Sequence, residues 1–498
     1  MDYLDPKKKH EHKVRLLFGY SLFAVAIGFA TLLLVYVANG YDVDRTTGQV
    51  IQNGLIYVNT RPGAADVYLN GQKQRGTTDA RLVVPAGSYT VGLKRLGYRD
   101  WNRSILLEGG SLRRLTYPRL IPEKLTTTSV ADLRSAPINS SQSIDRRWIV
   151  LSYDDRPLAL DIFDTNQSTS SALIFQIPEK LVLSPTGGKI GILEWADDNK
   201  HFIASYTTAT TVEYLFVNRE NPSESQNLTT LFADPELQVQ FQDRKQDKFF
   251  VYKPSTQTLF SATITGGVAT VPSVTNVQAY KTFGSDWVLY ITSSGKEGLV
   301  DARFKRGDKD ILLKQIKTSG SYLLQLAKLG TAPIMGISSP LENRAIVYND
   351  PEKYLNENPN VSTPIATTVL RVDNPIDLRI STDSSVILAY GGNSFASHEF
   401  DDDRSYNFKT NSAIDPGQEL RWLDGQHFMF SQGGVQTMMD FDGSNMYDLA
   451  PSLLSLGSLY TQNFNNMYTF SLPIAATDAT PATPARISIT SLLTAADR

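Results

Sequence analysis

The first clear pattern along the chain is an apolar run near the N-terminus. Residues 16–41 carry no charged side chain, and residues 16–38 are long enough to cross a bilayer as one helix. Basic residues precede this run, at Lys7, Lys8, Lys9, Lys13 and Arg15. Asp42 and Asp44 follow it, together with one basic residue, Arg45. Because positive flanks stay in the cytoplasm, we expect residues 1–15 inside and everything after Tyr41 outside the cell membrane.

A cleaved signal peptide is the competing interpretation of this run. Such a peptide has an apolar region of about 7–15 residues that ends in a small-x-small cleavage site. The run here is longer, and cleavage after Ala38 would place the bulky Tyr36 where a small residue is needed. The pattern therefore favours an uncleaved membrane anchor.

Short alternating segments follow a polar spacer at residues 39–53. They are separated by turn residues, as in the Asn70-Gly71 pair. The expected strands are 55–59, 66–70, 88–94, 101–107 and 111–117. Residues 54–121 are therefore predicted to form a small all-β sandwich.

The turn residues of this block resemble those of the PEGA domain family. The resemblance rests on residues 60–64 (TRPGA), 67–71 (VYLNG), 86–91 (AGSYTV) and the pair Gly97-Tyr98. Thr78 stands where the family usually has proline, and Arg61-Pro62 replaces the Pro-Glu of the family name. The resemblance implies a β-sandwich in a protein tethered beside a membrane, and it implies no catalytic residue.

The rest of the chain is rich in strands and carries a repeat. Residues 122–143 are rich in Ser, Thr and Pro and are expected to be a linker. From residue 144 to 498, a polar turn followed by a short apolar strand recurs about every 46 residues. The expected strand starts are Trp148, Phe202, Phe249, Trp287, Ile346, Val386, Phe428 and Tyr468. This period predicts a β-propeller of eight blades, with six or seven as alternatives and two β-sandwiches in series as the second fold.

Two short motifs resemble the degenerate propellers of periplasmic and cell-surface proteins. They are Trp422-Leu-Asp424-Gly425 and Asp440-Phe-Asp442-Gly443-Ser-Asn445. Most other repeats lack the full motif. The period is therefore stronger evidence for a propeller than the motifs are.

Charge is unevenly distributed along the chain. The net charge of −3 combines +1 for residues 1–53, +7 for residues 54–121 and −11 for residues 122–498. The basic residues that crowd the second half of the sandwich are Lys94, Arg95, Arg99, Arg103, Arg113, Arg114 and Arg119. These residues are predicted to form a basic face that is either solvated or docked on the acidic remainder of the chain. The alternative is a face that binds anions, namely lipid headgroups or an anionic wall polymer.

The sequence offers little catalytic chemistry. The chain has no cysteine and five histidines, and no motif for a serine hydrolase, a nucleotide-binding loop or a zinc protease is present. His201 and His427 precede the Phe of equivalent strands, which favours a structural role. His398 precedes an acidic turn, Asp401–Asp403, that lacks the spacing of a calcium loop. Asp440, Asp442 and Asn445 are also favoured turn residues.

We therefore expect no catalytic residue, metal or cofactor, and no nucleic-acid partner. The predicted function is a membrane-anchored, extracytoplasmic binding or scaffold protein of a bacterial envelope, which presents its propeller to a protein or glycan. The alternative is a surface enzyme that acts on glycans or peptides in the propeller funnel. The enzyme requires titratable side chains that converge on the funnel, whereas a funnel lined only by apolar or small residues excludes it.

Overall fold

The computed structural model describes residues 6–43, 48–167, 172–451, 453, 456–475 and 482–497. The flanking Asp44 and Arg45 lie outside the described residues, as do the side chains of Lys7, Lys8 and Lys9. The chain divides into two compact units. Unit 1 comprises residues 1–124, and unit 2 comprises residues 125–496.

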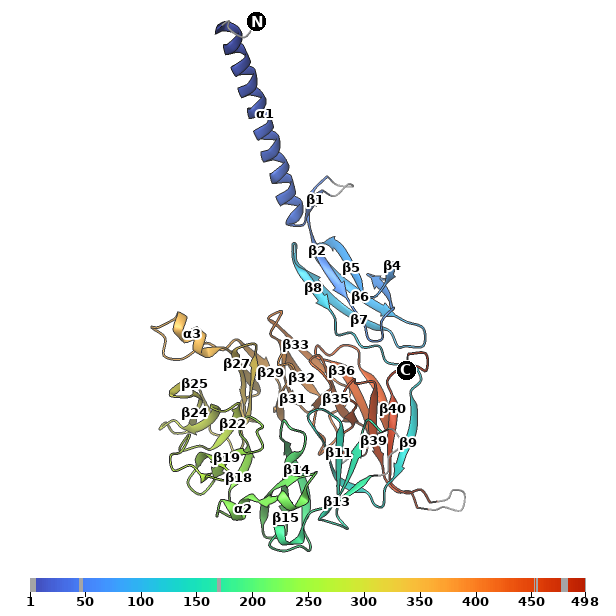
Figure 1. Ribbon diagram of the computed structural model, residues 1–498, viewed down its shortest axis with the longest axis vertical. Coiled ribbons are helices and arrows are strands. Elements are labelled where there is room, and N and C mark those ends of the chain that lie inside the picture. The colour runs from blue at the N-terminus through green and yellow to red at the C-terminus, as the bar shows by residue number, and fades with distance from the viewer. Residues whose placement is uncertain are drawn as a thin grey trace. The chain divides into compact units, whose positions relative to one another are not determined.

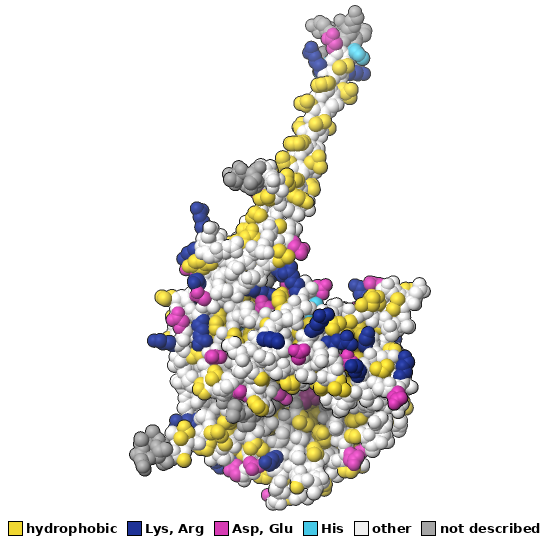
Figure 2. All heavy atoms as spheres, turned by 180° about the vertical axis from the view of Figure 1, so that it is seen from behind, with side chains coloured by type: hydrophobic (Ala, Val, Ile, Leu, Met, Phe, Trp, Pro, Cys, Tyr) yellow, Lys and Arg dark blue, Asp and Glu magenta, His cyan; other side chains and the backbone are white. Residues whose placement is uncertain are grey.

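Unit 1 begins with a long apolar helix, α1 (Pro6–Ala38). Its most apolar window has a mean hydropathy of 2.3, and none of that window is buried against the protein. Figure 2 shows hydrophobic side chains along the length of this helix. Among the described residues it is the one helix that is long and apolar enough to cross a membrane, so the predicted anchor segment is present as a candidate span.

The rest of unit 1 is a sandwich of two four-stranded sheets. The first sheet contains β1 (Tyr41–Val43), β2 (Val50–Val58), β5 (Ala80–Pro85) and β8 (Leu112–Leu115), which pairs with β2 in parallel. The second sheet contains β3 (Asp66–Leu69), β4 (Gln72–Thr77), β6 (Gly87–Lys94) and β7 (Trp101–Leu107). Sequence patterning thus located β2, β3, β6, β7 and β8. It missed the polar β4, the more apolar β5, and β1, which lies in the expected spacer.

A single core fills the sandwich. Alternate residues of β7 point inward, and Trp101 is fully buried with its ring in an edge contact with Tyr117, 5.9 Å between centroids. The Asn70-Gly71 pair joins β3 to β4 with positive φ at both residues, 49° and 81°. This geometry is the one that asparagine and glycine tolerate in a tight hairpin.

Unit 2 forms eight four-stranded antiparallel sheets within the described residues. The first four sheets are β10 (Pro137–Gln142), β11 (Trp148–Tyr153), β12 (Ala159–Asp164), β13 (Leu173–Gln176); β14 (Lys189–Trp195), β15 (His201–Thr207), β16 (Val212–Asn218), β17 (Gln226–Asn227); β18 (Gln238–Phe241), β19 (Lys248–Lys253), β20 (Thr258–Thr263), β21 (Gly267–Val268); and β22 (Ala279–Phe283), β23 (Trp287–Ser293), β24 (Leu299–Arg306), β25 (Lys309–Lys317).

The remaining four sheets are β26 (Leu323–Leu329), β27 (Ala332–Ser338), β28 (Arg344–Asn349), β29 (Thr368–Arg371); β30 (Asp377–Ile380), β31 (Val386–Gly391), β32 (Ser394–Glu399), β33 (Arg404–Lys409); β34 (Arg421–Trp422), β35 (His427–Gln432), β36 (Val435–Asp440), β37 (Tyr447–Pro451); and β38 (Leu459–Tyr460), β39 (Asn466–Ser471), β40 (Arg486–Ser491), β9 (Thr126–Asp132). Short helices α2 (Leu228–Leu231) and α3 (Pro351–Glu357) lie between strands.

These sheets form the closed ring of a β-propeller. Seven of the eight sheets described are meanders in chain order, and first strands of successive sheets contact one another, as β22, β26 and β30 do. In the last sheet, β9 from the start of unit 2 pairs with β40 from its end, and Figure 1 shows the two side by side. This pairing joins the two ends of the ring, and it covers the edge that β40 would otherwise present.

Two sequence-based expectations were wrong in this unit. Residues 122–143 are not an unstructured linker, because they supply β9 and β10. Ile346 does not start the second strand of its sheet, because it lies in the third strand, β28, and the second strand is β27. The error arose because β26 and β27 are joined by only Gly330 and Thr331, so the first long polar turn of that sheet follows β27.

Candidate functional site

The repeated polar turn of the sequence has a structural role. In the turn between the first and second strands of a sheet, an aspartate or asparagine side chain accepts a hydrogen bond from the backbone N–H two residues later, at 2.9–3.1 Å. The residues at this position are Asp145, Asp198, Asp383, Asp424 and Asn463. This side chain replaces a backbone acceptor and fixes the turn.

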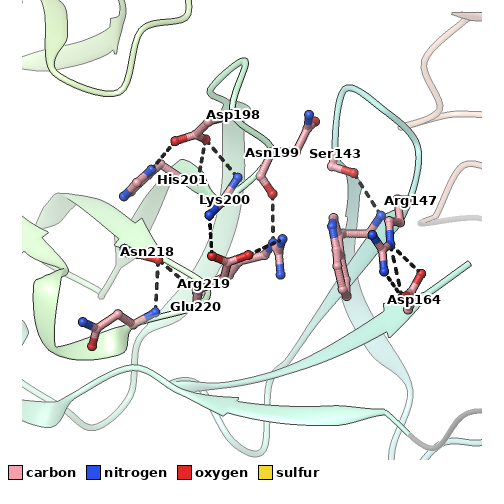
Figure 3. Close-up of polar contacts among 12 residues, drawn as sticks. Ser143, Arg147, Asp164, Asp198, Asn199, Lys200, His201, Asn218, Arg219 and Glu220 are labelled. Carbon is pink, nitrogen blue, oxygen red and sulfur yellow. Dashed lines mark hydrogen bonds and ion pairs between the residues drawn. The ribbon is translucent and has the colours of Figure 1, made fainter.

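His201 and His427 extend the same turn. The Nδ1 atom of His201 lies 2.5 Å from Asp198, and the Nδ1 atom of His427 lies 2.8 Å from Asp424. Figure 3 shows His201 and Asp198 in contact, beside the ion pair of Lys200 with Glu220. Each histidine is therefore held by the aspartate three residues before it, which fits the structural role favoured by the repeat.

A guanidinium and an indole join the first two sheets beside these turns. The Arg219 guanidinium lies 3.8 Å from the ring centroid of Trp148 and donates to the Asn199 carbonyl at 2.8 Å. Arg147 lies on the same indole at 4.7 Å and forms a bidentate pair with Asp164, drawn in Figure 3. Burial lowers the pKa of Arg219. All these groups have partners, so the cluster joins neighbouring sheets.

The other acidic candidates are also used locally. The Asn445 amide donates to Asp440 at 2.8 Å, and Asp442 accepts from the Ser444 N–H at 3.1 Å, within the turn after β36. The Nε2 atom of His398 lies 3.6 Å from Asp403. Within the described residues, no group of three or more His, Cys, Asp or Glu side chains could hold a metal ion.

The structure does not bring the seven predicted basic residues onto one face. Arg103 and Arg119 are only 6% and 4% exposed, and the Arg103 guanidinium donates to the Tyr117 hydroxyl. Lys94 pairs with Asp100, and Arg95 donates to the Gly63 carbonyl. Arg99 and Arg113 are half-buried, and Arg114 is exposed.

The first strands of unit 2 line two polar cavities instead. The first, here called the Lys281 pocket, has a volume of about 570 Å³ and is lined by β14, β18, β22, β26 and β30. The second, here called the Arg421 pocket, has a volume of about 640 Å³ and is lined by β10, β14, β30, β34 and β38. Together they involve the first strand of every sheet, so they form the central channel of the ring.

The Lys281 pocket has mixed charge with an acidic excess. Its charged lining consists of Glu194, Asp197, Asp243, Arg244 and Lys281. Burial lowers the pKa of Lys281, although the negative charge of Glu194 opposes that change. Burial raises the pKa of Glu194, because it disfavours the charged carboxylate. This carboxylate accepts a hydrogen bond from the Phe241 N–H at 2.8 Å.

The Arg421 pocket is basic. Its charged lining consists of Arg146, Arg379, Arg421 and Glu419. Arg379 contacts two carboxylates, Asp377 at 2.5 Å and Glu419 at 3.1 Å. Burial lowers the pKa of Arg421, and the negative charge of Glu419 opposes this change.

Sequence reasoning missed these channel residues. Arg379 and Arg421 lie in the short first strands β30 and β34, and such charged residues in a strand are typical of a solvated face. Only the knowledge that first strands face the ring axis identifies them as lining residues.

A third cavity, of about 800 Å³, lies away from the axis. It is lined by β25, β28, β29 and the segment 363–366. Its charged lining residues are the cations Lys296, Lys314 and Arg344. Lys296 donates to Gln315, and Arg344 contacts Glu342 at 2.9 Å. We therefore regard the central channel as the candidate functional site.

Comparison with known proteins agrees with the two-unit architecture. Residues 53–118 match the PEGA domain model, so the first β unit is a PEGA domain. No curated protein matches the sequence of the chain. The chain thus combines an apolar N-terminal helix, a PEGA domain and a β-propeller.

Solved structures similar to the chain include Hsv2 of Kluyveromyces lactis, with 11% identity and a TM-score of 0.40 over 64% of this chain and 98% of that one. The propeller of Dos1 has 12% identity and a TM-score of 0.43 over 74% and 94%. U3-55K has 8% identity and a TM-score of 0.36 over 73% and 98%. The assignment of unit 2 as a propeller rests on its own strand topology.

Proposed function

We propose that the protein is a membrane-anchored, extracytoplasmic binding or scaffold protein of a bacterial envelope, which presents its propeller to a protein or glycan. The central channel is the observation that carries this proposal. Its lining is polar and charged, and its volume is large enough for an extended polar segment. The one carboxylate of the Arg421 pocket, Glu419, is held by Arg379.

The contact between α1 and the PEGA domain supports the anchoring part of the proposal. The Asn53 N–H donates to the Gly40 carbonyl at 2.7 Å, and the Gln52 amide donates to the Asn39 carbonyl at 3.0 Å. Asn39 and Gly40 are the two residues that directly follow α1. Val43 and Val50, which pair beside it, are 50% and 60% exposed. Exposed apolar side chains next to an apolar helix suit a membrane interface.

A surface enzyme is the second candidate, because titratable side chains do converge on the channel. An enzyme needs a group whose pKa suits proton transfer and which is free to reach a substrate. Glu194 has a raised pKa, yet its carboxylate already accepts from a backbone N–H. Release of reducing sugar or peptide by the purified full chain, abolished by Glu194→Gln, would favour the enzyme over the binding protein.

Single-cysteine labelling tests the anchored orientation. Because the chain has no cysteine, one introduced cysteine gives one label. We expect an impermeant maleimide to label Leu96→Cys, which is 99% exposed in the PEGA domain, on intact cells. His12→Cys, at the N-terminal end of α1, becomes labelled only after the cells are opened. Labelling of both variants or neither on intact cells contradicts the orientation.

Crosslinking in cells, followed by mass spectrometry, tests the binding role. A photoreactive residue at Gln418, which lines the channel, is compared with one at Glu357, an exposed residue of α3 away from both pockets. We expect one reproducible protein or glycan adduct from position 418 that is absent from position 357. Identical adducts at both positions contradict a specific channel ligand.

A further inference from the structure

Among the three arginines of the Arg421 pocket, one has no hydrogen-bond or ion-pair partner in the part of the chain that the structure describes. The Arg421 guanidinium makes no hydrogen bond or ion pair with any residue that the structure describes, whereas the other two arginines of its pocket are engaged. Arg379 is held by two carboxylates, and Arg146 donates to the Leu423 carbonyl at 2.8 Å. A partly buried arginine normally has its donors satisfied, so this one is available to a ligand.

The surroundings of Arg421 favour an anion. Three arginines and one glutamate line the pocket, an excess of positive charge within a region whose net charge is −11. The neighbouring Lys281 pocket has the opposite excess, with three carboxylates and two cations. Of the two pockets, only the Arg421 pocket therefore has an excess of positive charge, and the low dielectric of the surrounding wall strengthens its effect.

Space at the guanidinium is provided by a glycine. Gly457 lies beside Arg421, and a Cβ atom at that position would lie 3.1 Å from the guanidinium carbon. The absence of a side chain lets the planar group lie against the backbone before β38. A fixed, planar guanidinium presents two parallel donors, which match a carboxylate or phosphate.

The remaining lining suits a sugar chain better than a hydrophobic peptide. Asn139, Ser141 and Ser143 contribute amide and hydroxyl groups from β10 and the turn after it. The half-buried Trp422 adds an aromatic surface at the same cavity. Small polar groups with one aromatic side chain can contact both the hydroxyls and the apolar face of a sugar ring.

We propose that the Arg421 pocket binds a carboxylate or phosphate group of an anionic glycan, with Arg421 as the main contact. This inference rests on the proposed binding function and specifies its ligand class. Arg379 and Arg146 contribute positive potential without giving up their protein partners. The ligand's adjacent hydroxyls contact the polar residues of β10.

Calorimetric titration of the full chain in nanodiscs tests the proposal with defined probes. Oligogalacturonate supplies carboxylates, oligo(glycerol phosphate) supplies phosphates, and the methyl ester of oligogalacturonate supplies the same sugar chain without charge. We expect at least one anionic probe to bind, to weaken with increasing salt and to bind at least about tenfold more tightly than the neutral ester.

Variants assign the binding to the pocket. We expect Arg421→Gln to weaken the binding of the anionic probe at least about tenfold, because a charge-assisted hydrogen bond is lost. Arg421→Lys keeps the charge but loses the planar fork, so its effect is smaller. The matched control is Arg371→Gln, which removes an exposed arginine of the outer strand β29 and leaves affinity unchanged.

Three results overturn the proposal. They are the absence of binding by every anionic probe, equal binding by wild type and Arg421→Gln, and tighter binding of an oligoglutamate peptide than of either glycan. The last result would assign the pocket to an acidic protein. If the adduct from position 418 persists in Arg421→Gln, the ligand class is wrong while the binding function stands. If the wild-type chain gives no adduct from position 418, the binding function itself is rejected.

Discussion

The PEGA domain and the propeller are stabilised in different ways. Both are built from antiparallel sheets, and neither has a disulfide, since the chain lacks cysteine. The PEGA domain relies on one small core around a few large side chains, above all Trp101. The propeller spreads its core over separate clusters between neighbouring sheets, such as the one that joins β12 and β15. The loss of one large side chain should therefore destabilise the PEGA domain more than the propeller. The loss of the pairing that closes the ring should destabilise the propeller more than the PEGA domain.

Opening the ring gives the largest expected effect. Replacing β9, Thr126–Asp132, by a glycine–serine segment of equal length removes the pairing that holds β40. We expect the propeller to lose its cooperative thermal transition and to become sensitive to proteolysis, because β40 becomes an unpaired edge. The PEGA domain should remain protease-resistant. An unchanged transition would show that the ring does not depend on β9.

The second effect tests the PEGA domain. Trp101 is fully buried, so Trp101→Ala removes a large side chain from a small core. We expect a loss of about 3–5 kcal/mol in the free energy of unfolding of this domain, measured by chemical denaturation, and no change in the propeller transition. The control is Leu96→Ala, at a 99% exposed position. A parallel loss of stability in the propeller would show that the two units do not unfold independently.

The closure of the ring could not be predicted from sequence, whereas much of the PEGA domain could. The alternation of β7 is visible in the sequence, and it even places Arg103 on the inward face with Trp101 and Ile105. β9 has the sequence TTTSVAD, with few apolar residues, and its partner β40 begins more than 350 residues later. Local patterning contains no information on such a pairing.

The channel residues illustrate the same limit. The period of the repeat is local and predicts the propeller fold. Arg421 and Lys281 acquire their meaning only when first strands from distant sheets converge on one axis. The repeated turn aspartates, by contrast, contact residues two or three positions away, so their sequence repeat reflects their structural role.

The third effect concerns a buried histidine of the propeller. Burial lowers the pKa of His398 below its usual 6.5, although Asp403 opposes the change; Ser405 and the Phe400 ring also face the imidazole. The unfolded chain therefore binds a proton that the folded one does not, as pH falls through 6.5. Stability is fully present above that pH and declines below it, by at most about 1.4 kcal/mol per pH unit.

Chemical denaturation of wild type and His398→Gln between pH 7.5 and about 5 measures this effect. The difference between the two proteins removes the contribution of other titrating groups. We expect the propeller of the variant to lose less stability on acidification, while the PEGA domain shows no difference. Identical pH slopes for the two propellers would contradict a neutral, buried His398.

The smallest expected effect is the loss of one turn aspartate in the propeller, which we compare with the loss of a large side chain from the PEGA core. Asp198 accepts from the N–H groups of Lys200 and His201, at 2.9 and 3.0 Å. Asp198→Ala removes both bonds together with the contact to the His201 imidazole, and we expect a loss of about 1 kcal/mol, measured by chemical denaturation. Asp198→Asn keeps an acceptor for the backbone and should recover most of it. Three other turns carry aspartate at this position and one carries asparagine, so we expect the ring to tolerate such a loss. A cost as large as that of Trp101→Ala would show that the stability of the ring is not distributed over its turns.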